Sequence, residues 1–202
     1  MSAGVSSLPA WHLDAEKTGG VHLIILGARR FAPHWDIRLR RLPLNNGVRL
    51  RMEAEKVIRI IESAFEGVRL GAGIGLWEAQ AIDDYETESI QRKNRAKDEK
   101  DEWKNLKTED LQRCHSSLSF FDADGMKFHL PAYIISTLKG EDVEDPVFHL
   151  VGLDEYALSR FTSLDSKQKG AVRTFLEWCS EQEEFEFEGP NITRALNEFW
   201  CN

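Results

Sequence analysis

The stretch that most constrains this chain runs from Ser116 to Leu138 and reads SSLSFFDADGMKFHLPAYIISTL. Bulky apolar residues at its start favour a strand. The Asp122–Gly125 segment favours a turn, because Asp bonds its own backbone and Gly tolerates a positive φ. Apolar and polar residues then alternate, which is typical of a second strand, and Pro131 suits the first turn of a helix. The pattern predicts a β-hairpin over residues 118–130 and a helix that ends at Gly140.

Helical spacing of apolar residues predicts several further helices. They are expected to begin near Glu53, Leu76, Asp165 and Asn191, with a short helical turn after Thr108. VFHLV at 147–151 favours a third strand, and the acidic stretch 181–188 favours an edge strand or a loop. We therefore expect an α+β fold with four or five helices around a small antiparallel sheet of two to four strands.

Residues 1–51 differ in composition from the rest of the chain. They hold eight basic residues against three acidic ones, a net charge of +5, and show no sustained periodicity. VHLIILG could form one isolated strand there, and a single strand is not stable by itself. A basic arm, a targeting peptide and an accessory or mis-annotated extension are the possible interpretations. We favour the extension, with Met52 as the natural start, and expect one globular domain over residues 52–202.

The charge of this expected domain limits its partners. Residues 52–202 hold 18 basic and 31 acidic residues, so their net charge is −13. Such a balance argues against a nucleic-acid partner and favours a basic protein partner. No apolar run approaches the length of a membrane helix, so we expect no membrane association. The odd cysteine count, without C-x-x-C spacing, predicts free thiols in a reducing, cytoplasmic location.

Leu70 to Leu76, LGAGIGL, is glycine-rich and resembles a phosphate-binding loop only superficially. A helix is expected before it, whereas a dinucleotide fingerprint follows a strand and spaces its glycines as G-x-G-x-x-G. The favoured interpretation is a connection between two helices.

The candidate site groups two histidines with three residues of the neighbouring elements. His129 and His149 each lie in an F-H-L sequence on strands expected to be adjacent, and Asp83, Asp84 and Tyr133 are the polar groups expected nearby. The histidines could bind a metal with a carboxylate as third ligand, or supply a general base. Two structural histidines and two solvated carboxylates are the alternative. We expect no cofactor.

Three segments carry a resemblance to a known family. They are GIGLWEAQAIDDY, SFFDADGMKFHLPAYI and FTSLDSKQKGAVRTFLEW. Together they resemble an uncharacterised bacterial family of small cytosolic proteins, over about residues 53–200. The resemblance carries no catalytic role with it. Similar patterns in proteins found near polymorphic toxins imply a possible immunity-like role.

Two functions from different classes follow from these observations. The first is a small acidic protein-binding module, immunity-like in one version, that recognises a basic protein partner. The second is a small hydrolase, metal-dependent or based on His and Asp, that uses the candidate site. Whether the chain is an enzyme is left open by its sequence.

Overall fold

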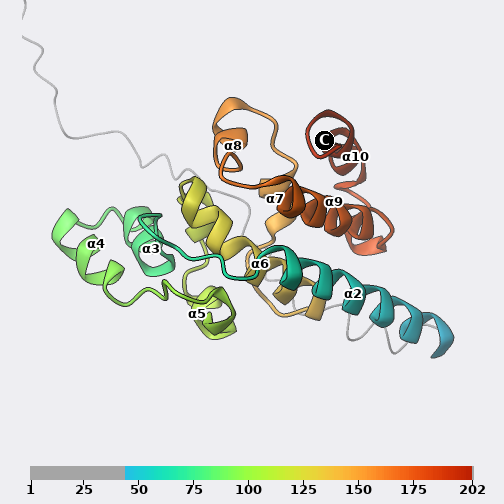
Figure 1. Cartoon of the computed structure of the whole chain (residues 1–202), viewed down its shortest axis with the longest axis horizontal. Coiled ribbons are helices and arrows are strands. Elements are labelled where there is room, and N and C mark those ends of the chain that lie inside the picture. Colours follow the sequence, from blue (N-terminus) through green and yellow to red (C-terminus); the bar gives the residue numbers. More distant parts are fainter. Residues whose placement is uncertain (1–43, 202) are drawn as a thin grey trace, which may run out of the picture. The chain divides into compact units, whose positions relative to one another are not determined.

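The computed structural model describes residues 44–201 (Figure 1), with side chains from residue 49 onward. This stretch contains nine α-helices and three 3₁₀ turns and no strand, so the expected α+β fold is wrong. The isolated strand considered at VHLIILG lies outside the described residues. The elements are α2 (Leu44–Ala64), α3 (Leu76–Asp83), α4 (Glu88–Arg95), η1 (Trp103–Asn105), α5 (Thr108–Arg113), η2 (Ser117–Ser119), α6 (Ala123–Lys139), α7 (Pro146–Leu150), α8 (Glu155–Ser159), α9 (Ser166–Ser180), η3 (Glu183–Phe185) and α10 (Gly189–Glu198).

The predicted hairpin is instead the start of α6, the most buried helix of the described part. Asp122 is its N-cap and accepts a hydrogen bond from the Gly125 N–H at 2.8 Å, so the expected turn is the first turn of the helix. Pro131 lies well inside the helix, where its missing N–H leaves the Lys127 carbonyl without its helical partner. Gly140 ends the helix in the left-handed conformation, as the sequence predicts.

The strand predicted at residues 147–151 is absent, and residues 181–188, expected to be an edge strand or a loop, form turns. VFHLV forms the short helix α7, which begins at Pro146 behind the N-cap Asp145. The Asp145 carboxylate accepts a hydrogen bond from Val147 N at 2.8 Å. The acidic stretch 181–188 contains the turn η3 and leads directly into α10. The cap from Asp145 and the proline that follows it thus override the β propensity of VFHLV.

The prediction for α9 is confirmed in its start and in its buried face. Asp165 caps the helix and forms a reciprocal pair with Gln168, in which each side chain accepts from the other residue's backbone N–H. The predicted stripe is the buried face of the helix: Gln168, Ala171, Val172, Phe175, Leu176 and Cys179. The predicted start of α3 near Leu76 is also confirmed.

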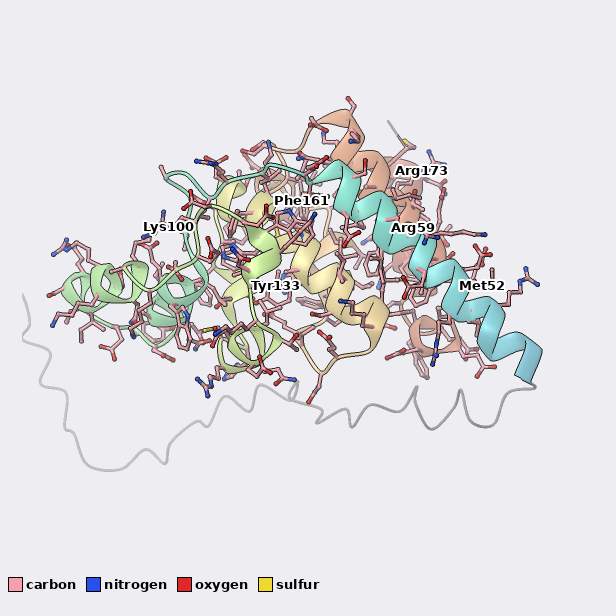
Figure 2. The ribbon with its side chains drawn as sticks, turned by 60° about the horizontal axis from the view of Figure 1, so that its bottom comes forward. Met52, Arg59, Lys100, Tyr133, Phe161 and Arg173 are labelled. Atoms are coloured by element: carbon pink, nitrogen blue, oxygen red, sulfur yellow. The ribbon has the colours of Figure 1, made fainter. Side chains whose placement is uncertain are left out.

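Helix α2 begins at Leu44, before the start near Glu53 that its apolar pattern predicts. Among its described side chains, which start at residue 49, the first buried one is Ala54, and Met52 is largely exposed (Figure 2). The helix packs against α9 and α6, and α9 packs in turn against α10 (Figure 1). The core of the described part therefore forms around α6, and Tyr133 lies inside it (Figure 2).

The glycine-rich loop between α2 and α3 packs backbone to backbone against the start of α6. A Cβ on Gly73 would lie 2.6 Å from the Gly125 nitrogen, and one on Gly125 would lie 2.4 Å from the Ile74 oxygen. Asp122 joins the two segments, since its Oδ1 also accepts a hydrogen bond from Ile74 N at 3.0 Å. The glycines therefore serve close packing, and the expected connection between two helices is a tightly held one.

Candidate functional site

His129 is fully buried on α6 and is bonded to its own helix. Its Nδ1–H donates to the Gly125 carbonyl at 2.7 Å, and its ring stacks on Phe121 with centroids 4.2 Å apart. Desolvation lowers the pKa of the imidazole to about 3, against the opposing effect of the Gly125 bond. The other ring nitrogen, Nε2, is buried and has no hydrogen-bond partner. A neutral ring out of reach of solvent is unsuited to proton transfer with a substrate.

Tyr133 lies one helical turn after His129 and is also fully buried. Its hydroxyl has no hydrogen-bond partner, and desolvation raises its pKa. No hydrogen bond therefore joins this hydroxyl to Asp83 or Asp84, the groups expected near it. Tyr133 acts as a packing residue of α6.

His149 lies on α7 in a closed network around the peptide of Leu118. Its Nε2–H donates to Glu144 Oε1 at 3.0 Å, and Arg160 Nη1 approaches its Nδ1 at 3.5 Å. Glu144 accepts from Leu118 N at 3.2 Å, while Arg160 donates to Leu118 O at 2.9 Å. Both ring nitrogens of His149 thus have protein partners. The network joins α7, α8 and η2, so the role of His149 is structural.

Asp83 and Asp84 lie at the end of α3 and bond to a side chain of the same helix. Gln80 Nε2 donates to Asp84 Oδ1 at 3.1 Å and approaches Asp83 Oδ2 at 3.5 Å. No hydrogen bond in the described part joins either carboxylate to a histidine. The structure brings His129 and Tyr133 together on one helix and places His149 and the two carboxylates in separate hydrogen-bonding networks.

A metal site built from these residues gains no support. Within residues 49–201, no group of three or more His, Cys, Asp or Glu side chains is arranged to hold a metal ion. The cysteines of this part, Cys114, Cys179 and Cys201, are all free thiols, and the first two are buried.

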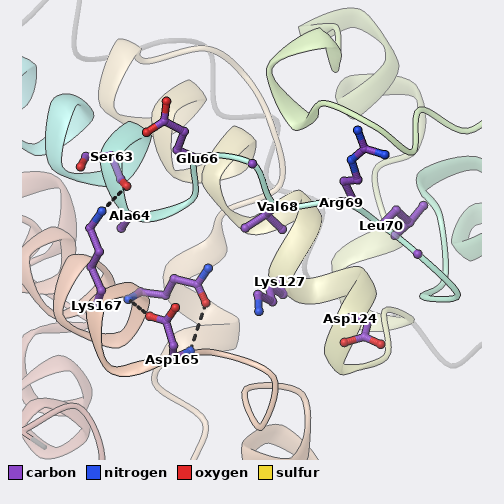
Figure 3. Close-up of a pocket in the computed structure, with 13 residues that line it drawn as sticks. Ser63, Ala64, Glu66, Val68, Arg69, Leu70, Asp124, Lys127, Asp165 and Lys167 are labelled. Atoms are coloured by element: carbon purple, nitrogen blue, oxygen red, sulfur yellow. Dashed lines mark hydrogen bonds between the residues drawn. The ribbon is translucent and has the colours of Figure 1, made fainter.

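An open pocket of about 610 Å³ lies where three elements meet (Figure 3). Its wall consists of the end of α2 with the following loop (residues 63–71), the first turns of α6 and the start of α9. The lining side chains include Lys127 and Asp124 from α6 and Lys167 and Gln168 from α9. The sequence pattern contains no signal that the end of α2 and the starts of α6 and α9 meet.

A second surface feature is an acidic face, which we define as Asp145 and the five glutamates of residues 181–188. The two segments are close enough to interact electrostatically. The pKa of Asp145 is raised to about 6, first by desolvation and then by Glu188 and Glu184. Within the part that the structure describes, Glu181, Glu186 and Glu188 have no cationic partner.

Two aromatic rings lie exposed on the segments that form this face. Phe187 stands between two of the glutamates and is 89% exposed. Phe148 follows Asp145 on α7 and is 74% exposed, while its neighbours Val147 and His149 are buried. Exposed aromatic rings flanked by charge are typical of protein-binding surfaces. The alternation of Phe185 and Phe187 suggested a strand, whereas the structure buries one ring and exposes the other.

The comparisons with known proteins give one match. Residues 53–202 match the sequence model of DUF6714, described as a family of unknown function, which confirms the resemblance inferred from the motifs. No curated protein and no solved structure matches the chain.

Proposed function

The chain belongs to the DUF6714 family of unknown function, and we propose that it is a protein-binding domain whose acidic face binds a basic protein partner. The observation that carries this proposal is the gathering of six carboxylates on segments that also expose two phenylalanines. Like charges repel one another and lower stability, so a fold gains nothing by gathering them. A partner with lysines and arginines would relieve the repulsion and cover the rings.

The expected chemistry of such an interface follows from its charge. A basic partner would be attracted at long range, which raises the rate of association and makes binding sensitive to salt. Phe187 and Phe148 would supply the apolar contact that the charges alone lack. An immunity-like protein would be one form of this function, with a basic toxin as the partner.

The alternative function, a small hydrolase, gains no supporting geometry. It requires an accessible base, and His129 is buried with a low pKa while both nitrogens of His149 are occupied. His115 contacts the Ser116 hydroxyl at 3.0 Å, but this exposed pair has no third group to orient the ring. A binding function requires none of these features.

The first test is a capture experiment with two charge-reversal variants. The full chain, Glu181→Lys/Glu186→Lys on the acidic face and Glu55→Lys/Glu86→Lys elsewhere are immobilised and exposed to a lysate of the natural host at low and high salt. We expect a basic protein to bind the full chain and the second variant, and to bind the face variant about tenfold more weakly. The captured protein is then purified and its affinity for each chain measured directly.

Two results would contradict the proposal. One is equal binding of the partner to both charge-reversal variants, since the control carries the same charge change at another place. The other is binding that is insensitive to salt, because an interface based on exposed charges is screened by ions.

A second prediction concerns Phe187. Phe187→Ala is expected to change the free energy of unfolding by less than about 0.5 kcal/mol, because the ring touches little of the protein. The same change is expected to weaken binding of the captured partner about tenfold or more, as truncation of an interface anchor does. Urea unfolding and calorimetric titration measure the two effects. Unchanged affinity would exclude Phe187 from the interface.

A further inference from the structure

The open pocket is lined by a side-chain amide that has no protein acceptor and by two ammonium groups without a carboxylate partner. We propose that it binds an oxyanion, the phosphate or carboxylate group of a small ligand, through Gln168 Nε2, Lys127 Nζ and Lys167 Nζ. This site is built from other residues than the acidic face, so it stands independently of the proposed protein partner.

Gln168 is the residue that points to a ligand. It is 2% exposed, and its Oε1 accepts the Asp165 backbone N–H at 3.0 Å, which fixes the amide so that Nε2 is the free end. Nε2 has no hydrogen-bond partner among the described residues, although Gln168 lines the pocket. Nε2 is not one of the fully buried polar atoms that lack a partner, so it reaches the pocket. Its two N–H bonds are therefore free to donate to an acceptor from outside the protein.

Two lysines from different helices, Lys127 and Lys167, line the same pocket (Figure 3). Lys127 lies half-buried on α6 and forms no ion pair or hydrogen bond with a described residue. Lys167 donates to the Ser63 carbonyl at the end of α2, and its ammonium group keeps two further N–H bonds. The pocket wall thus carries three groups that only donate, one from α6 and two from α9.

The carboxylates in the wall do not cancel this preference for an anion. Asp165 accepts the Gln168 backbone N–H at 2.8 Å and Asp124 accepts the Ser163 hydroxyl at 2.7 Å. Each also lies at the positive end of a helix dipole, which offsets part of its charge. Glu66 is the remaining acid of the wall, and Arg69 is paired with Asp101 at 3.4 Å, so the two lysines are the cations of the wall without a carboxylate partner. The free donors of Gln168 and the two lysines favour an oxyanion.

The size of the pocket indicates that the oxyanion belongs to a larger molecule. Its volume of about 610 Å³ lies within the range of small-molecule sites, on the order of 300–1,000 Å³. A bare phosphate ion would occupy only the part of the pocket next to Gln168. Inorganic phosphate and acetate are therefore suitable probes of the chemistry and would bind more weakly than the whole ligand.

The experiment compares Gln168→Glu with Gln112→Glu. A glutamate at position 168 keeps the reciprocal cap with Asp165, since Glu is a usual partner in that motif, but it replaces the free donor with an acceptor. Gln112 is exposed on α5, so the control makes the same chemical change outside the pocket. The full chain and both variants are titrated with phosphate, and separately with acetate, against chloride at constant ionic strength.

We expect one of the two anions to raise the melting temperature of the full chain and of Gln112→Glu in a saturable way. The rise is about 3 to 6 °C at ten times the dissociation constant. Gln168→Glu should show no rise, and the side-chain amide resonance of Gln168 should shift during the titration of the full chain. The anion that acts distinguishes a phosphate ligand from a carboxylate ligand.

Lys127→Met provides a second variant in case Gln168→Glu does not fold, because the Lys127 side chain has no structural partner. It is expected to weaken the anion effect at least about tenfold, as loss of a charged donor does. A rise that persists in both variants would overturn the proposal. So would the absence of any saturable effect of either anion on the full chain.

Discussion

At the scale of single residues, the buried histidine of α6 makes the stability of the protein depend on pH. The imidazole of His129 has a pKa of about 3 in the folded chain and 6.5 when solvated. The unfolded chain therefore takes up the proton first as the pH falls. The contribution of the neutral imidazole to the free energy of unfolding is fully present above about pH 6.5. It falls by about 1.4 kcal/mol for each pH unit between about pH 6.5 and pH 3.

The corresponding prediction uses His129→Phe, which keeps the stacking on Phe121 and removes the titrating group. Between pH 7 and pH 5 the full chain should lose about 2 kcal/mol more unfolding free energy than this variant. Urea unfolding at the two pH values measures the difference, with His115→Gln, at an exposed position, as control. Parallel pH profiles of the full chain and His129→Phe would show that the ring reaches solvent.

Asp98 shows the opposite dependence on pH. Desolvation raises the pKa of its carboxyl to about 6, although Trp77 N donates to it at 2.7 Å. The folded chain then binds the proton more tightly, so the contribution of Asp98 to stability is greatest below about pH 4 and is lost toward pH 6. Both the full chain and His129→Phe carry Asp98, so the comparison between them isolates the histidine.

At the scale of elements, the N-terminus of α3 is capped by a residue from a distant part of the chain. Gly75 occupies the N-cap position and has no side chain that could accept a backbone N–H. The Asp98 carboxylate acts as the cap instead, because it accepts a hydrogen bond from Trp77 N. A Cβ on Gly75 would lie 2.0 Å from Asp98 Oδ2. The glycine thus leaves room for a cap that enters from outside α3.

We therefore expect Gly75→Ala to destabilise the protein by about 2 to 4 kcal/mol, through overpacking and loss of the cap. Gly170→Ala is the matched control, because Gly170 lies inside α9 with nothing within 4 Å of an added Cβ. That control should gain about 0.5 to 1 kcal/mol, since alanine favours a helix. Chemical denaturation measures both changes. Equal effects of the two substitutions would contradict the close contact with Asp98.

At the scale of the whole molecule, the start of the folded domain remains a prediction. Helix α2 begins at Leu44, but the first buried one of its side chains described from residue 49 onward is Ala54, and Arg51 and Met52 are exposed. The family match begins at residue 53. A chain that starts at Met52 keeps every residue of α2 that the structure describes as buried and loses the first two turns of the helix.

We expect the chain from Met52 to melt within about 5 °C of the full chain, on the order of 1 kcal/mol or less for a domain of this size. Calorimetry of both chains, together with helix content from circular dichroism, measures the effect. A larger drop in melting temperature would show that residues 1–51 contribute to the stability of the fold. The outcome decides whether the basic segment contributes to the fold.

The described helices do not include a membrane span. No helix in residues 44–201 is both long and apolar enough to cross a bilayer. In the sequence, the expectation of a basic protein partner rests on the net negative charge of residues 52–202 alone. In the structure, part of this negative charge gathers on the acidic face.

The sequence by itself determined the elements that have one buried face and one solvated face. The start of α9, its cap and its stripe from Gln168 to Cys179 follow from helical spacing and from Asp165. The start of α3 and the end of α6 at Gly140 were also predicted correctly. In each case the information is local, because a cap or an amphipathic period involves residues a few positions apart.

Only the tertiary structure decided the class of the fold and the place of each candidate site. Helix α6 is buried on nearly all sides, so its apolar residues lose the helical period and residues 126–130 resemble a strand. His129 alternates with apolar residues in the sequence, as a residue on the solvated face of a strand does, yet it is fully buried. The cap from Asp98, the bonds of His149 and the pocket at Gln168 join segments that are far apart in the sequence. Such contacts form only when the helices pack, so no local pattern records them.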